Sequence, residues 1–343
     1  MGKVRWGVIG CGGIADRRTL PGMMLSTNSE LVAVMDSDGA SARRVAEKYG
    51  AKYAFDRYEE LLALPGIDAV YIASPVFAHK EQAFAAARAG KHILLEKPLG
   101  LTLKESEEIV DFCEACGVKL GVGLMMRYHA YHQAIRKIIA DGVIGDIVSM
   151  RAQFTCWYPK MENCWRQDPD LSGGGALMDM GIHCIDLLQY LSGLTAVECS
   201  GFAYNQTFGY AADDSAAVIM KMNNGALAYV DSNFNIPDAA AKCPLEFYGT
   251  KGSIVAEGTL GQVEGGTVRV LACPNAAGYD AQQDRSLVEP VEVTVEFGNM
   301  YTKEIEAFAA ALLNGTEPPV NGRNTLLNQR VIEAVYRTNG GKL

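Results

Sequence analysis

The chain has 343 residues, of which 49% are hydrophobic and 21% are charged, and it carries a formal net charge of −9. A chain of this length usually exceeds what one hydrophobic core organises, so two domains are expected, and its apolar content excludes a disordered protein. The negative charge argues against a nucleic-acid partner or an anionic membrane surface, because both present negative phosphates.

The sequence also lacks the usual signals of membrane insertion or export. No apolar run reaches the roughly 20 residues that a membrane-spanning helix needs, and the apolar stretch 1–9 is too short for a signal peptide. We therefore expect a cytoplasmic protein whose nine cysteines are reduced. Cys113 and Cys116 form a CxxC pair, but they lie in an amphipathic helical stretch without a second pair, so helix packing is favoured and no metal site is expected.

Residues 1–123 alternate short apolar runs with longer stretches of 3.6-residue periodicity. This alternation predicts βαβ units whose parallel strands are covered by helices on both faces. Because such crossovers are nearly always right-handed, we expect a doubly wound Rossmann domain of the α/β class. The expected strands are 4–9, 31–35, 69–73, 93–95 and 120–122, and the expected helices are 40–49, 80–89 and 103–116.

Residues 124–343 show a different pattern of expected secondary structure. Strand-like runs follow one another there, with Gly, Asn or Pro turns between them. Consecutive strands without intervening helices predict antiparallel hairpins, so this second domain is expected to be α+β, with one large, mostly antiparallel, open-faced sheet. The expected helices are 131–140, 178–191, 301–313 and 326–337, and the expected strands are 147–154, 196–208, 215–222, 226–234, 245–248, 253–257, 267–271 and 291–297.

The helices of the second domain are too few to cover both faces of such a sheet. The uncovered face would expose apolar side chains unless it met a partner subunit. We therefore expect a homodimer or homotetramer that assembles through the C-terminal sheet.

A glycine-rich loop, Gly10-Cys11-Gly12-Gly13-Ile14-Ala15, follows the first expected strand and opens a helix. Gly10, Gly12 and Ala15 occupy the three positions of the dinucleotide fingerprint. The first glycine allows a tight turn, the second lets the backbone approach a pyrophosphate, and the third small residue lets the helix pack closely. The whole loop, including Gly13 and Ile14, is expected to bind a dinucleotide.

Asp36 ends the second expected strand, 21 residues after Ala15. A carboxylate at this place accepts hydrogen bonds from the ribose hydroxyls of NAD and repels the 2′-phosphate of NADP. No arginine follows it directly, and Arg43 and Arg44 come later, within the next expected helix. NAD is therefore favoured over NADP.

Three segments, Ser74-Pro75-Val76-Phe77-Ala78-His79, Ala89-Gly90-Lys91-His92 and Glu96-Lys97-Pro98, resemble the Gfo/Idh/MocA family of NAD(P)-dependent oxidoreductases. That family includes glucose-fructose oxidoreductases and inositol dehydrogenases, and the resemblance extends over essentially the whole chain. It implies that Lys97 is a catalytic residue and that Glu96 and His79 lie near the nicotinamide end of the cofactor. Ser74 and Pro75 are expected to contribute to the same cofactor site.

Physical reasoning supports the role of Lys97 independently. Ligands of open α/β sheets bind beyond the carboxyl ends of the strands, and Lys97 lies just beyond one of these ends. An ammonium group there can stabilise an alkoxide that forms on a substrate hydroxyl. Pro98 biases Lys97 toward an extended backbone and so restrains its direction.

Asp179 and His183 follow a triple glycine, 173–175, and are four residues apart. On a helix they share one face, and the glycines would let the backbone approach a ligand closely where that helix begins. The family resemblance implies that they complete a catalytic triad with Lys97. Because histidine titrates near neutrality, His183 is the expected general acid/base. Lys97 is then its electrostatic and proton-relay partner, and Asp179 orients the substrate or His183.

The substrate site is less specific in the sequence. Trp165 and Arg166, just before the glycines, resemble a pair found in many members of the family, and they suit a sugar ring that stacks on an indole and accepts hydrogen bonds from a guanidinium. Arg127 and Tyr158 are further candidates, with a structural role as the alternative for both. The three triad residues are also expected to contact the substrate.

Together these patterns predict an NAD-dependent dehydrogenase or reductase that acts, without a metal, on a secondary alcohol or ketone of a sugar, inositol or related cyclic polyol. Two alternatives stay open. One is an NAD-dependent glycosidase of the same fold, which oxidises a sugar carbon transiently, eliminates the aglycone and returns the hydride. The other is a sugar or nucleotide sensor without chemistry, against which the intact Lys97, Asp179 and His183 argue.

Overall fold

The structure is a computed structural model that describes residues 2–274, 278–279, 281–283 and 288–338. Contacts group the chain into two compact units, each assembled from separate stretches. The first unit comprises Met1–Met125, Cys164–Gly174 and Asn299–Gln329, and the second comprises Met126–Asn163, Gly175–Gly298 and Arg330–Leu343. The expected division after residue 123 separates two continuous stretches of sequence, whereas each of these units combines several stretches. The division at residue 123 stays a prediction.

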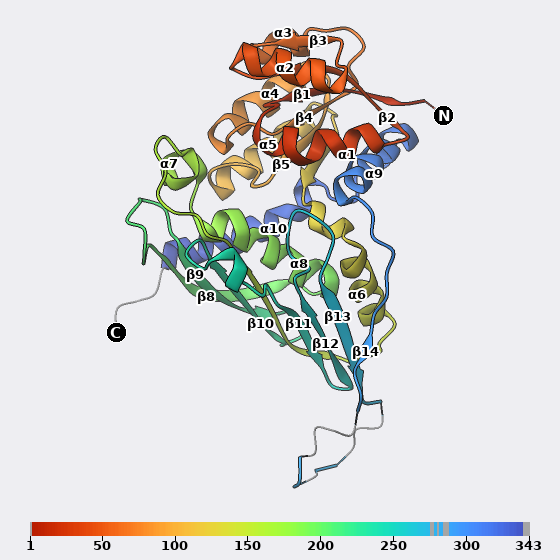
Figure 1. Ribbon diagram of the computed structural model, residues 1–343, viewed down its shortest axis with the longest axis vertical. Coiled ribbons are helices and arrows are strands. Elements are labelled where there is room, and N and C mark those ends of the chain that lie inside the picture. Colours follow the sequence, from red (N-terminus) through yellow and green to blue (C-terminus); the bar gives the residue numbers. More distant parts are fainter. Residues whose placement is uncertain (1, 275–277, 280, 284–287, 339–343) are drawn as a thin grey trace. The chain divides into compact units, whose positions relative to one another are not determined.

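The first unit is built on a six-stranded parallel sheet with the strand order β3-β2-β1-β4-β5-β6 (Figure 1). This is the order of a doubly wound dinucleotide-binding sheet, so the expected Rossmann architecture is confirmed. The sequence does not reveal β3, because its three residues are only partly buried. The strands are β1 (Val4–Ile9), β2 (Ser29–Met35), β3 (Tyr53–Phe55), β4 (Ala69–Ile72), β5 (His92–Glu96) and β6 (Leu120–Gly123).

Helices cover both faces of this sheet. The helical segments of this unit are η1 (Ala15–Thr19), α1 (Leu20–Leu25), α2 (Gly39–Tyr49), α3 (Tyr58–Leu62), η2 (Val76–Ala78), α4 (His79–Arg88), α5 (Leu103–Ala115), η4 (Trp165–Gln167), α7 (Pro169–Ser172) and α9 (Met300–Asn314). On one face, Trp6 packs in a core with residues of α1, α2 and α9, and its ring centroid lies 5.4 Å from that of Phe308. On the other face, β1 approaches α3 so closely that a Cβ on Gly7 would lie 2.6 Å from Leu61.

The second unit is built on an eight-stranded sheet with the order β14-β13-β12-β11-β7-β10-β9-β8. Every neighbouring pair is antiparallel except β7 and β10, which confirms the expected mostly antiparallel sheet. The strands are β7 (Ile147–Thr155), β8 (Ala196–Tyr204), β9 (Ser215–Met222), β10 (Leu227–Asn233), β11 (Leu245–Gly249), β12 (Gly252–Glu257), β13 (Thr267–Ala272) and β14 (Val291–Glu292).

Two of these strands end earlier than the sequence pattern predicts. β8 ends at Tyr204 rather than near 208, because the backbone N–H groups of Gln206 and Thr207 donate to the Asp214 carboxylate, both at 2.8 Å, instead of to a neighbouring strand. β14 pairs with β13 over only two residues, so the apolar run that continues to 297 forms no ladder.

Helices of the second unit lie on one face of its sheet (Figure 1). Segments η5 and α8 pack on β7 and β10, and α6 packs on α8. The opposite face exposes apolar side chains. The helical segments of this unit are α6 (Ala130–Ala140), η5 (Leu177–Gly181), α8 (Ile182–Ser192) and η6 (Asp238–Ala240). Two further segments, η3 (Met125–Tyr128) and α10 (Gly322–Thr338), have residues in both units. The apolar residues exposed on the open face, by 38% to 55%, are Phe202, Tyr204, Ile219, Leu227, Tyr229 and Tyr248.

Among the described residues, no helix combines the length and the apolar character needed to cross a bilayer. The expectation of a cytoplasmic protein with reduced cysteines stays a prediction. Cys113 is buried within α5, and Cys116 is exposed at the C-terminal end of that helix, as the helix-packing interpretation of the CxxC pair requires.

Candidate active site

The glycine loop leaves β1 and leads into η1, in the place that a dinucleotide site requires. Gly10 has φ +80°, and a Cβ there would lie 2.6 Å from the backbone nitrogen of Ser74, so only glycine fits. Gly13 has open space around the position of a Cβ. The turn is therefore tight against the protein at Gly10 and accessible at Gly13, and these residues fit a bound pyrophosphate.

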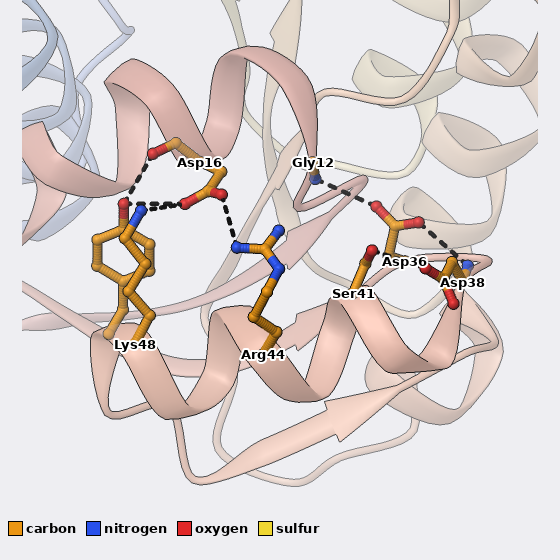
Figure 2. A network of polar contacts seen from close by, with 8 residues as sticks. Gly12, Asp16, Asp36, Asp38, Ser41, Arg44 and Lys48 are labelled. Carbon is orange, nitrogen blue, oxygen red and sulfur yellow. Dashed lines mark hydrogen bonds and ion pairs between the residues drawn. The ribbon is translucent and has the colours of Figure 1, made fainter.

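Asp36 lies beside this loop at the end of β2 (Figure 2). Its Oδ2 accepts a hydrogen bond from the Gly12 N–H at 3.1 Å, and its Oδ1 accepts one from the Asp38 N–H at 3.1 Å. Carboxylate oxygens have further lone pairs, so these bonds leave acceptor capacity for ribose hydroxyls. The two backbone contacts hold the carboxylate at the edge of the glycine loop.

His79 connects the loops that follow β4 and β5. It is only 1% exposed, and its ring nitrogens lie 3.0 Å from the Ser74 and Pro98 carbonyl oxygens. Burial lowers the pKa of His79, which outweighs the effect of these carbonyls. Ser74 also donates to Gln82 at 2.5 Å, and Pro75 caps η2. His79 thus joins two loops from within, and a direct cofactor contact for it stays a prediction.

Glu96 is the acceptor at the end of a short hydrogen-bond chain. The buried Tyr71 hydroxyl donates to Glu96 Oε1 at 2.5 Å, and Thr19 Oγ1 lies 2.9 Å from the same phenol oxygen. Burial raises the pKa of Glu96, and the Tyr71 hydrogen bond and the positive charge of Lys97 oppose that rise. A Cβ on Gly123 would lie 3.0 Å from the carboxyl carbon of Glu96, so β6 leaves the space that this side chain occupies.

Lys97 follows the carboxyl end of β5, where the sequence places it. Its backbone N–H donates to Glu96 Oε2 at 3.3 Å. Trp165 and Arg166 belong to the same compact unit, the guanidinium lies 4.3 Å from the indole centroid, and the charge of Arg166 also acts on Glu96. A glutamate, a lysine and an arginine are therefore associated in the first unit.

Glu304, on α9, lies in the electrostatic field of this group. Its side chain is only 2% exposed. Burial, together with the negative charge of Glu96, raises the pKa of Glu304 well above its usual value, and the Leu124 N–H opposes the shift without reversing it. Burial and the neighbouring charge of Glu96 therefore both favour the protonated form of Glu304 over its anion.

In the second unit, Asp179 lies in η5 and His183 lies in the first turn of α8. A separation of four residues is about one helical turn, so the two side chains lie on the same side of the helix. Single π-turns are frequent at functional sites. Asp179 is partly exposed within an otherwise buried segment. His183 is 4% exposed, and its ring lies edge-on to Phe154 with centroids 6.1 Å apart.

Asp213 holds the start of this segment. Its carboxylate accepts the Gly175 N–H at 2.7 Å, the Leu177 N–H at 2.9 Å and the Tyr336 hydroxyl at 2.8 Å. A Cβ on Gly175 would lie 1.9 Å from the Asp213 carbonyl oxygen. The glycine is therefore needed for contact with the protein's own backbone, and the approach of the glycine run to a ligand stays a prediction.

The remaining substrate candidates are engaged within the second unit. Arg127 forms a bidentate ion pair with Asp186, at 2.8 and 2.5 Å, and its guanidinium lies 4.6 Å from the centroid of the Tyr190 ring. Tyr158 packs on Phe234 with ring centroids 5.0 Å apart. These contacts are sufficient reason for both residues to be present, and their roles in substrate binding stay predictions.

The predicted residues thus fall into two groups. The glycine loop, Asp36, the 74–79 segment, Glu96 and Lys97 belong to the first unit with Trp165 and Arg166, and Asp179 and His183 belong to the second with Arg127 and Tyr158. Sequence reasoning missed the supporting groups Thr19, Tyr71, Glu304 and Asp213. The sequence does contain a sign of Asp213, because two adjacent aspartates, Asp213 and Asp214, directly precede the expected strand 215–222. Among the described residues, no cluster of His, Cys, Asp or Glu side chains could hold a metal ion.

Comparison with known proteins agrees with this arrangement. A family model described as an oxidoreductase family with an NAD-binding Rossmann fold matches residues 4–124, and a model of the GFO/IDH/MocA C-terminal domain matches residues 132–255. The chain belongs to the Gfo/Idh/MocA family. It is therefore an NAD(P)-dependent oxidoreductase, and the resemblance inferred from Glu96-Lys97-Pro98 is confirmed at the level of the family.

Relatives match nearly the whole chain. A 1,5-anhydro-D-fructose reductase of Ensifer adhaerens is 29% identical over 93% of this chain and 91% of its own. A D-xylose 1-dehydrogenase (NADP(+)) of Haloferax volcanii is 29% identical over 97% of this chain and 96% of its own. The solved structure of a 3-ketoreductase from Actinomadura kijaniata, in complex with NADP and TDP-benzene, is 26% identical, covers 98% of both chains and has a TM-score of 0.82.

The raised pKa of Glu304 has a consequence for stability. Between the pKa of an unfolded glutamate, about 4.3, and the higher pKa of Glu304, the folded chain holds a proton that the unfolded chain releases. Stability from this group is therefore lost as pH rises. Glu304→Gln removes the titration, so its stability relative to the wild type should increase from about pH 5 to about pH 8, by up to roughly 1.4 kcal/mol per pH unit.

Urea denaturation at both pH values measures this trend. Glu60→Gln, at an exposed position on α3, is the control for the loss of one negative charge. A stability difference between Glu304→Gln and the wild type that does not change with pH would show that Glu304 is ionised in the folded chain.

Removal of the Asp213 side chain should destabilise the second unit. Asp213→Ala leaves two backbone N–H groups and the Tyr336 hydroxyl without their acceptor, which should cost about 2–4 kcal/mol, whereas Tyr336→Phe removes one hydrogen bond and should cost about 1 kcal/mol. Glu198→Ala, on the exposed strand β8, should change stability by less than about 0.5 kcal/mol. Equal urea midpoints for Asp213→Ala and Glu198→Ala would refute this role of Asp213.

Proposed function

We propose that this protein transfers a hydride between NAD and a secondary alcohol or ketone of a sugar, inositol or related cyclic polyol. The observation that carries the proposal is Lys97 at the carboxyl end of β5, bonded through its backbone to Glu96, in the same domain as the dinucleotide loop. Relatives named as a fructose-derivative reductase and a xylose dehydrogenase support a carbohydrate substrate. A panel of inositols, aldoses, sugar acids and 3-keto sugars, followed by nicotinamide absorbance, tests it.

The choice of NAD over NADP is part of this proposal. It is supported by the Asp36 carboxylate, which two backbone N–H groups hold at the edge of the glycine loop. A 2′-phosphate would meet that negative charge, whereas ribose hydroxyls would donate to it. Because relatives include an NADP-dependent xylose dehydrogenase, the family does not settle the cofactor. Substrate oxidation with each dinucleotide at equal concentration provides the comparison.

The proposed chemistry divides among three residues. Bound nicotinamide supplies the hydride acceptor or donor. His183 takes the proton from the substrate hydroxyl, or returns it in the reverse direction, as general base or acid. The Lys97 ammonium stabilises negative charge on the same oxygen, and Asp179 orients His183 or the substrate. The alternative reaction, that of an NAD-dependent glycosidase, would produce no net change in nicotinamide absorbance, because the hydride is returned to the sugar.

Substrate recognition is proposed for Trp165 and Arg166. Their stacked pair presents an indole face and guanidinium donors, which suits a hydroxylated ring. Lys97, Asp179 and His183 contact the reacting hydroxyl in this proposal. Arg127 and Tyr158 are secondary candidates, because each is already engaged by neighbouring side chains.

His183→Ala should reduce kcat by about 10²- to 10⁴-fold, because the general base is lost. The dissociation constant for NAD, measured by calorimetry on the full chain, should stay within about twofold, since His183 is not placed in the dinucleotide site. Tyr190→Phe, on the same helix, is the control for a general effect on α8. Near-normal turnover of His183→Ala would overturn the assignment of the base.

We also propose that the protein is a homodimer or homotetramer assembled through the open face of the second sheet. Support comes from the exposed apolar side chains there, including Ile219 at 50% and Tyr229 at 38%, which are opposite each other on β9 and β10. Exposed apolar side chains grouped on one face of a sheet support an interface there.

Ile219→Asp combined with Tyr229→Asp should lower the mass in solution, measured by light scattering, because both changes place charge on that face. Met24→Asp, at an exposed apolar position on α1, should leave the mass unchanged. A wild-type chain that is already monomeric at working concentration would contradict the proposal.

A further inference from the structure

Asp16 binds two cations beside the glycine loop (Figure 2). It directly follows Ala15, the last fingerprint position, and it is largely buried. Its Oδ2 accepts from Arg44 Nη1 at 3.0 Å, and its Oδ1 accepts from Lys48 Nζ at 2.7 Å. Both cations come from α2, the helix that begins just after Asp36. The first fingerprint helix and the helix after β2 are therefore joined by one carboxylate.

Arg44 lies within electrostatic range of the glycine loop itself. The Cys11 thiol belongs to this loop, and burial raises its pKa to about 12. The negative charge of Asp36 adds to this rise, and the positive charge of Arg44 opposes it. In Figure 2 the Arg44 guanidinium lies between Asp16 and the carboxylate of Asp36. A cation is thus present near the ribose edge of the site, but its ion pair is made to Asp16.

We propose that Asp16 is a second determinant of dinucleotide choice, because it holds Arg44 and Lys48 away from the position of a 2′-phosphate. This inference rests on the proposed preference for NAD. NADP sites commonly supply an arginine for the 2′-phosphate, and a guanidinium bound to a carboxylate must first give up that partner. In this proposal Asp36 repels the 2′-phosphate of NADP, and Asp16 binds the two cations that could otherwise neutralise that phosphate.

A purely structural clamp is the alternative explanation for Asp16. The Tyr49 hydroxyl already joins α2 to the backbone oxygen of Asp16 at 2.7 Å, so contact between the two helices does not depend on the carboxylate alone. Asp16→Asn keeps the shape and one acceptor oxygen, replaces the other oxygen with an amide donor, and removes the charge that attracts Arg44 and Lys48. The two explanations therefore differ in whether Asp16→Asn changes selectivity.

Calorimetric titration of the full chain with NAD and NADP, without substrate, measures the effect directly. In an Asp36→Asn background, Asp16→Asn should tighten NADP binding by a further factor of about five, the scale of one exposed ion pair, while NAD binding stays within about twofold. The gain should shrink as salt concentration rises. Adding Arg44→Ala and Lys48→Ala should abolish it.

Asp68→Asn is the matched control, because Asp68 is another ion-paired acid of the same domain, bound to Arg5 at 2.8 Å. The proposal is overturned if Asp16→Asn changes NAD and NADP binding equally, if the gain survives without Arg44 and Lys48, or if Asp68→Asn reproduces it. Tighter binding of NADP than NAD by the wild type would refute the NAD assignment, and the effect of Asp16→Asn on the NADP to NAD ratio would still decide the role of Asp16.

Discussion

Carboxylates that accept backbone N–H groups hold the loops on which both parts of the candidate site depend. In the first unit, Asp36 accepts from Gly12, and in the second, Asp213 accepts from Gly175 and Leu177. A turn that leaves the hydrogen-bond ladder of a sheet loses its backbone partners, and a buried N–H without an acceptor costs about 1–3 kcal/mol. Because a carboxylate has two oxygens, it satisfies two such groups at once. Each loop therefore takes its shape from one side chain.

A carboxyl group beside Lys97 is also held by hydrogen bonds. Glu96 is bonded by the Tyr71 hydroxyl and by the Lys97 N–H, and its space is left open by Gly123. The buried Glu304 lies within electrostatic range of Glu96, and its pKa is raised because a second anion in a low-dielectric region would be costly. Burial therefore limits the negative charge that this region of the first unit holds near Lys97.

Family membership and cofactor choice are separate questions in this protein. The Rossmann architecture is shared with relatives that bind NADP, so the fold supplies a pyrophosphate site for either dinucleotide. In our proposal, selection depends on charges at the ribose edge, where Asp36 is held by backbone bonds and Arg44 is bound to Asp16. On that proposal, a few side chains set selectivity without any change of fold.

Local pattern was sufficient to predict the parallel sheet, the glycine loop and the lysine after β5, because hydrophobic periodicity and glycine spacing act over a few residues. It could not predict that α9, at positions 300–314, packs in the core around Trp6, or that Asp213 holds Gly175 from 38 residues away. The buried Glu304 and the short β3 also left no periodic signal. Such contacts join residues distant in the chain, and packing of the whole unit decides which of them meet, so only the tertiary structure reveals them.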